Sequence, residues 1–168
     1  MLTDAVRLLL FPALMAFAAS SDLLTMTISN RLSLALTAAF FLMAAVTGMS
    51  LHSFGLHLAA GALVLAFSFV FFTQGWIGGG DAKLAAVTAL WFAPDQALLY
   101  FIYAAFLGGV LTLGILQIRT GLLPMALYRV PWIAQLHDSR TGVPYGAAMA
   151  PAALIVFPDT AWVTHTVF

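Results

Sequence analysis

The chain carries very few charged residues. Only 7% of its 168 residues are charged, whereas 63% are hydrophobic and the mean hydropathy is +1.05. Because a soluble domain usually has about 25% charged residues, this composition excludes an ordinary soluble protein and predicts an integral membrane protein. The net charge is zero, so the composition implies no nucleic acid or other polyanion as a partner.

Cysteine is missing altogether, and so is glutamate. Without cysteine the chain can form no disulfide, thiolate nucleophile or cysteine-based zinc site. The alternation of polar and apolar residues that is typical of membrane barrels is also absent, so the spanning elements are expected to be helices. All six acidic residues are aspartates, and each can be considered individually.

Long apolar runs fill most of the chain. The 49 residues between Arg31 and Asp81 contain no charge, enough for two spans of about 20 residues and a turn. The pattern predicts an all-α polytopic membrane protein that forms a single domain of residues 1–168 with about six transmembrane helices. The six segments are roughly 6–21, 32–49, 56–72, 77–92, 96–118, and from 145 to between 157 and 163.

The basic residues predict the orientation of these helices. With six spans, one side holds five basic residues and the other holds only Arg7; the five are Arg31, Lys83, Arg119, Arg129 and Arg140. By the positive-inside rule the five-residue side is cytoplasmic and the N-terminus lies outside. Asp22, just after the first span, and Asp81, at the start of the fourth, then share the cytoplasmic side.

The stretch "GGGDAK" at 78–83 allows three interpretations. Its glycines could only permit close helix packing, with Asp81 as a helix cap. A phosphate loop is a poor match, because the GxxxxGK[ST] spacing is missing. In the third interpretation the glycines leave room for an extended substrate strand beside Asp81. The fourth segment is short, with about 18 Å of helix from Asp81 to Phe92, so Asp81 is expected in a recessed, wet cavity.

Asp22 is the expected partner of Asp81. Two neighbouring carboxylates share a proton, so one can act as base and the other as acid. The base would take a proton from a water that attacks a peptide carbonyl, while the acid protonates the carbonyl oxygen. We expect Lys83 to lie near Asp81 and to favour its negative charge.

Three motifs together resemble the prepilin peptidase (type IV leader peptidase) family of GxGD membrane aspartic proteases. They are "GGGDAKL" with Gly78, Gly80, Asp81 and Lys83; "SDLLTMTISNRL" with Asp22 and Asn30; and "VPYGAAMAPAAL" with Pro144, Tyr145, Gly146 and Ala148. The chain departs from the family where Ser29 replaces the usual proline of Ile-Pro-Asn, and where no basic residue follows Asp22 shortly. Presenilin-like proteases also contain Gly-x-Gly-Asp, but their first aspartate follows tyrosine, whereas Ser21 precedes Asp22 here.

The resemblance implies a function, a partner and a location. Asp22 and Asp81 would be the catalytic pair, and Asn30, Gly78, Gly80, Lys83, Pro144, Tyr145 and Gly146 would shape the site or bind substrate. The expected substrate is a prepilin with a basic leader and an apolar helix, cleaved at the cytoplasmic face of the bacterial inner membrane. No metal or cofactor is expected. Without a cysteine-bearing region, the chain resembles the short members that lack methyltransferase and zinc-binding regions and are associated with Flp/Tad pili.

A different class of function stays open at this stage. Asp22 and Asp81 could form a structural or proton-binding pair in a non-catalytic assembly factor or a proton-coupled transporter component. Such a protein would tolerate Asn at either position far better than a protease. The connection 119–143 mixes Arg129 with Tyr128, Trp132 and Leu136, so it is expected to lie on the membrane surface, where it could cover the site.

Overall fold

Helices account for the whole regular structure, as the hydropathy pattern predicts. The computed structural model describes residues 2–164, and no β-strand occurs within this range. The long helices are α1 (Leu2–Thr25), α2 (Asn30–Thr47), α3 (Leu51–Thr73) and α5 (Pro94–Thr120). The shorter ones are α4 (Gly79–Ala89), α6 (Met125–Tyr128), α7 (Pro131–His137), α8 (Gly146–Val156), η1 (Phe157–Asp159) and α9 (Ala161–Thr164).

Four of these helices are long and apolar enough to cross a membrane, namely α1, α2, α3 and α5. The all-α membrane fold class predicted from the sequence is therefore confirmed. Helices α4 and α8 have 11 residues each, or about 16 Å, against a hydrocarbon core of about 30 Å. Six membrane crossings therefore stay a prediction. The fourth apolar segment is short, as expected, and the sixth is short as well.

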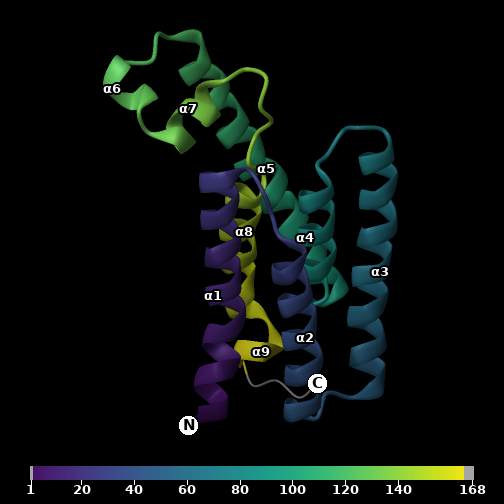
Figure 1. The fold of residues 1–168 in the computed structure, drawn as a ribbon. Helices are drawn as coiled ribbons and strands as arrows, with labels where there is room; N and C mark the ends of the chain where they lie inside the picture. The colour runs from purple at the N-terminus through teal and green to yellow at the C-terminus, as the bar shows by residue number, and fades with distance from the viewer. Residues whose placement is uncertain (1, 165–168) are drawn as a thin grey trace.

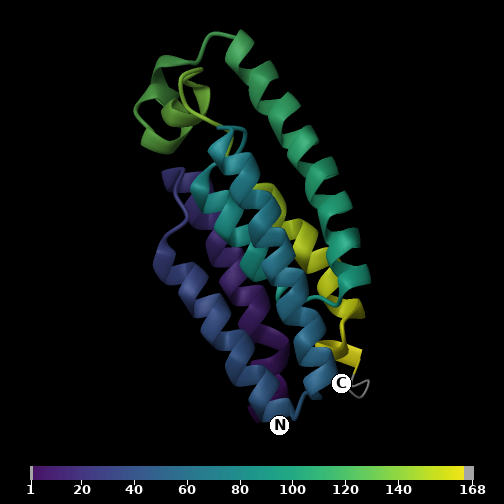
Figure 2. The ribbon, with the colours of Figure 1, turned by 90° about the vertical axis from the view of Figure 1, so that its right-hand side faces the viewer.

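Successive helices run in opposite directions (Figures 1 and 2). The C-terminal ends of α1, α3 and α5 and the N-terminal ends of α2, α4 and α8 therefore meet at one end of the bundle, drawn uppermost in Figure 1. We call this the upper end. Helices α6 and α7 form a small lobe beyond it, between the end of α5 and the start of α8. The ends of helices that are far apart in the sequence therefore lie close together at the upper end.

Local capping explains where several helices begin and end. Ser29 is the N-cap of α2, and its hydroxyl accepts a hydrogen bond from the Leu32 amide at 3.3 Å. Ser50 caps α3 in the same way through the Ser53 amide. Helix α2 ends at Gly48, whose φ of 68° is a left-handed conformation that glycine adopts without strain. Ser29 thus gives α2 a defined start at the position where the resemblance leads one to expect proline.

An aromatic core closes the lower end of the bundle. The rings of Phe11 and Trp91 lie 4.9 Å apart, and the indole of Trp162 donates a hydrogen bond to the Trp91 carbonyl at 2.7 Å. The Trp91 indole in turn donates to the Leu36 carbonyl at 3.2 Å, and the buried His57 ring bonds the Leu90 carbonyl at 2.7 Å. These contacts connect the C-terminal end of α4 to α2, α3 and α9. They fix the position of α4, and Asp81 lies at the other, N-terminal end of this helix.

Candidate active site

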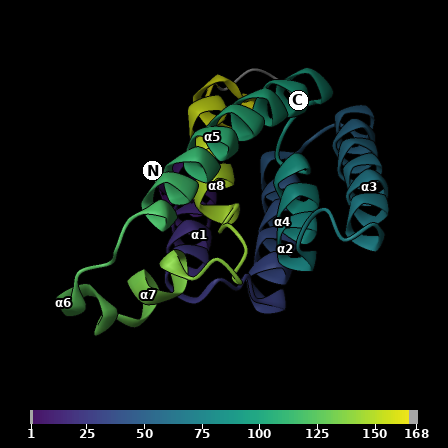
Figure 3. The same cartoon turned by 90° about the horizontal axis from the view of Figure 1, so that it is seen from above.

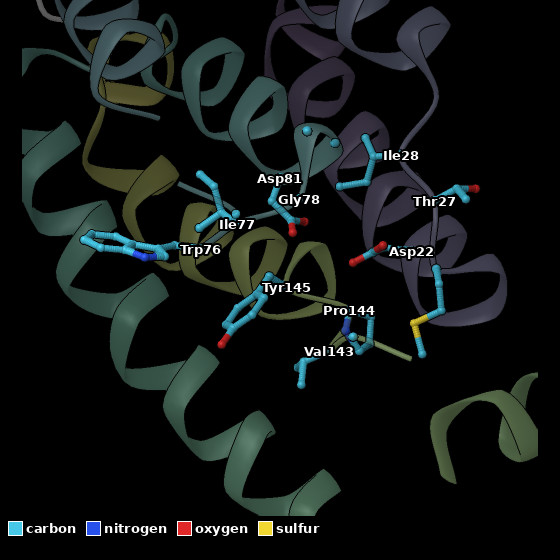
Figure 4. A pocket seen from close by; sticks show the side chains of 15 residues that line it. Asp22, Thr27, Ile28, Trp76, Ile77, Gly78, Asp81, Val143, Pro144 and Tyr145 are labelled. Carbon is cyan, nitrogen blue, oxygen red and sulfur yellow. The ribbon is translucent and has the colours of Figure 1, made fainter. Parts of the chain in front are cut away.

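A cavity of about 600 Å³ opens at the upper end, where α1 ends and α4 and α8 begin. Its walls come from three segments that are distant in the sequence and that contain the three motifs (Figure 4). The lining residues are Asp22, Met26, Thr27, Ile28, Gly75, Trp76, Ile77, Gly78, Gly79, Gly80, Asp81, Gly142, Val143, Pro144 and Tyr145.

Asp22 lies in the last turn of α1, and its side chain is buried. The amide of Gly146 donates a hydrogen bond of 2.7 Å to its Oδ2 atom, although 124 positions separate the two residues. Gly146 is the first residue of α8, and the free amides at a helix N-terminus are well suited to bind a carboxylate. The start of α8 therefore fixes the orientation of Asp22.

Asp81 is the third residue of α4, whose N-cap is Gly78. Its carboxylate accepts a hydrogen bond from the Gly78 amide, the contact that an acidic residue at this helix position commonly makes. The carboxylates of Asp81 and Asp22 face each other across the cavity (Figure 4) and are close enough for their charges to interact. The fold thus brings together two aspartates that are 59 positions apart, at 22 and 81.

Glycines make this close arrangement possible. A Cβ atom at Gly146 would lie 2.9 Å from Asp22 Oδ2 and 2.9 Å from Ile28 Cδ1. A Cβ atom at Gly80 would lie 3.2 Å from Ile28 Cβ, and one at Gly78 would lie 3.0 Å from Asp81 Oδ2. Ile28 is therefore packed between the glycine turn and the start of α8, and all three motifs meet around its side chain.

Tyr145 and Pro144 form the wall of the cavity on the α8 side. The Tyr145 ring packs against Gly108 of α5, where a Cβ atom would lie 3.2 Å from the ring. The Thr112 hydroxyl, one turn further along α5, lies 3.3 Å from the Tyr145 hydroxyl. The Pro144 carbonyl accepts the Ala147 amide at 3.1 Å and so helps to start α8. Helix α5 thus positions Tyr145 at the cavity.

Asn30 and Lys83 lie outside the cavity that was expected to contain them. Neither is among the residues that line the cavity. The Lys83 ammonium donates a hydrogen bond of 2.8 Å to Asn30 Oδ1, which links the first turns of α2 and α4. The expectation that Lys83 accompanies Asp81 is therefore not met, because its side chain leaves α4 toward α2. The pair can still shape the site indirectly by holding these two helix starts together.

Several lining residues were not singled out from the sequence. Trp76 and Ile77 directly precede the glycines, so their proximity to the motif was an available signal. Nothing in the sequence indicated that Met26 lines the cavity, because its φ of 53° is uncommon for a residue other than glycine and could not be expected of methionine. This conformation turns the chain immediately after α1, and it is what brings Thr27 and Ile28 back over the cavity.

The sequence was also compared with known families and structures. A family model described as "Type IV leader peptidase family" matches residues 9–113, which is more than half of the chain and includes both Asp22 and Asp81. No curated protein and no solved structure gives a significant match. The match covers the first two of the three motifs and confirms the resemblance: this chain belongs to the type IV leader peptidase family of membrane proteases.

Proposed function

We propose that the chain is an aspartic endopeptidase that removes the leader peptide of prepilin-like proteins, with Asp22 and Asp81 as its catalytic pair. The observation that carries this proposal is the pair of carboxylates facing each other across one cavity. Each carboxylate accepts a hydrogen bond from a backbone amide, that of Gly146 or Gly78, so both have a defined orientation. Family membership supports a protease, and the cavity supplies the residues for aspartic chemistry.

The reaction follows from two carboxyl groups and a water molecule between them. One carboxylate takes a proton from the water as it attacks the peptide carbonyl, and the other carboxyl group protonates the carbonyl oxygen. The glycine turn 78–80 presents backbone without side chains, which leaves room for an extended substrate strand. Trp76 and Tyr145 add aromatic rings to the lining of the same cavity. The mechanism needs no covalent intermediate with the enzyme.

The substrate and the side of cleavage are inferred from charge. Five of the six basic residues belong to the upper end or to its lobe, namely Arg31, Lys83, Arg119, Arg129 and Arg140. By the positive-inside rule this end faces the cytoplasm. A prepilin whose basic leader stays in the cytoplasm, and whose apolar helix enters the membrane, would present its cleavage site at this level. Flp-type prepilins are the substrates to test first.

The test is leader cleavage in a bacterial host that expresses both the chain and an Flp-type prepilin. We expect processing by the wild-type chain, and a loss of roughly 10²–10⁴-fold for Asp22→Asn and for Asp81→Asn, because each removes an acid–base group. Asp95→Asn is the matched control, since Asp95 lies in the first turn of α5 at the lower end. Cleavage that survives Asp22→Asn or Asp81→Asn at equal protein level would contradict the mechanism.

A further inference from the structure

A second hollow lies on the side of the bundle formed by α2, α3 and α4. It measures about 380 Å³, and it shares no lining residue with the active-site cavity. Helix α4 lies between α2 and α3 (Figure 3) and forms the floor, while residues such as Thr37 of α2 and Leu65 of α3 form the walls. We call this hollow the α2–α3 groove. It extends along α4 from Lys83 to Leu90, or about 10 Å of helix.

The walls of the groove are mostly apolar, but its upper part is polar. Lys83 is the only charged residue among those that line it. Asn30 accepts one of the three N–H donors of this ammonium, which leaves donors for an anion. Ser33 also lines the groove; it is only 8% exposed, and its hydroxyl has no hydrogen-bond partner among the described residues. A buried hydroxyl without a partner is uncommon, and a water molecule or another polar group would satisfy it.

The surroundings of the groove indicate what can occupy it. Leu34, Ala62 and Leu65, which line it, are exposed on the outer surface of the bundle, so the groove opens toward the surrounding lipid. An unbranched hydrocarbon chain fits a narrow apolar groove along its length, and a membrane supplies such chains at every lipid-facing surface.

We propose that the α2–α3 groove binds one acyl chain of an anionic phospholipid, whose phosphate interacts with Lys83. The chemistry is complementary at both ends, because the acyl chain contacts the apolar walls formed by residues such as Leu58, Leu65 and Val87. The phosphate oxygens accept hydrogen bonds from the donors of the Lys83 ammonium that Asn30 leaves free. Basic pockets between membrane helices on the cytoplasmic side commonly bind anionic head groups. The bound lipid therefore supports the lipid-facing side of α4 next to Asp81.

The test uses the purified full-length chain in nanodiscs of phosphatidylcholine. A phosphatidylglycerol with a photoreactive diazirine on its acyl chain is added, and the labelled residues are mapped by mass spectrometry. We expect labels on the groove walls, including Leu34 and Leu65, and competition by unlabelled phosphatidylglycerol that is stronger than by phosphatidylcholine. Lys83→Met should reduce this preference about fivefold, since one basic residue near the head group contributes about that much.

Two exposed alanines on α3 provide a matched pair of variants. Ala62 lines the groove, whereas Ala66, one turn along α3, does not. We expect Ala62→Phe to reduce groove labelling about tenfold, because displacing two buried methylene groups already has this effect on affinity. Ala66→Phe should leave the labelling unchanged, and Ala62→Leu is a smaller substitution should Ala62→Phe impair folding.

Three results would overturn the proposal. Labelling spread evenly over all lipid-facing helices would show that the groove has no preference for lipid. Equal effects of Ala62→Phe and Ala66→Phe would show that the groove is not the binding site. Groove labelling that disappears when a prepilin is added or when the chain dimerises would identify a different occupant. Because the readout is lipid labelling, the outcome is independent of peptidase activity and of the proposed catalytic pair.

Discussion

Gly146 occupies a position where the structure has no room for a side chain. A Cβ atom there would lie 2.9 Å from Asp22 Oδ2 and 3.1 Å from Asp22 Cβ, and the Gly146 amide holds the same carboxylate. We expect Gly146→Ala to push the Asp22 carboxylate away from the start of α8. The rate of leader cleavage should fall about 100-fold, because misplacing a reacting group by about 1 Å has this effect. The measurement is cleavage of purified prepilin by purified enzyme at matched concentrations.

The control for this substitution is another glycine in a helix. A Cβ atom at Gly109 of α5 would meet no atom within 4 Å. Gly109→Ala should therefore retain full activity, and its stability should rise by up to about 1 kcal/mol because alanine favours the helix. If Gly146→Ala were as active as Gly109→Ala, the contact between α8 and Asp22 would have no role in positioning the carboxylate.

Individual residues of the site could be predicted from the sequence to different degrees. Asp22 and Asp81 could be predicted to lie at the same end of the bundle, because two whole apolar segments separate them in the sequence. Their positions across one cavity could not, since these depend on how α1, α4 and α8 pack. The direction of the Lys83 side chain also depends on packing, because it is set by Asn30, which is 53 positions away.

At the scale of elements, Arg119 connects α5 to the segment that leads into the site. Its Nε donates to the Leu136 carbonyl at 2.8 Å, and its Nη2 donates to Thr141 Oγ1 at 3.1 Å and the Gly142 carbonyl at 3.0 Å. Gly142 lines the cavity and lies four positions before Gly146, whose amide holds Asp22. Arg119 therefore holds the end of α5 to the segment that leads to the cavity.

We expect Arg119→Lys to weaken this connection, because an ammonium cannot reproduce the planar fork of a guanidinium. Losing one charge-assisted hydrogen bond corresponds to about a tenfold change, so leader cleavage should slow by about that factor. Limited proteolysis should become faster within 121–142, a change that a defect in the Asp22–Asp81 pair alone would not cause. Arg129→Lys is the control in the same lobe, and similar proteolysis of both variants would argue against the assignment.

The elements themselves were largely predictable, whereas the lobe was not. The six apolar segments all form helices near their expected bounds, because hydropathy and helix length depend on local sequence. The connection 119–143 was expected to lie on the membrane surface, and it contains the short helices α6 and α7. Its exposed residues Leu122 and Met125 fit that expectation in composition, but its position beyond the bundle depends on the distant contacts of Arg119.

At the scale of the whole molecule, the proposed function requires one orientation in the membrane. The upper end must face the cytoplasm, because a prepilin leader remains on that side. The absence of cysteine makes this testable, since any introduced cysteine is the only thiol in the chain. Ser139, in the lobe, and His52, near the start of α3, are both exposed and lie at opposite ends of the bundle.

We expect a membrane-impermeant maleimide to label the His52→Cys variant in intact spheroplasts of a bacterial host. The Ser139→Cys variant should become labelled only after the membrane is permeabilised, because the basic residues of the upper end keep it in the cytoplasm. Both variants should cleave prepilin, since neither position lines the cavity. The reverse labelling pattern would place Asp22 and Asp81 at the outer face. Cleavage of a cytoplasmic leader could then not occur at this site.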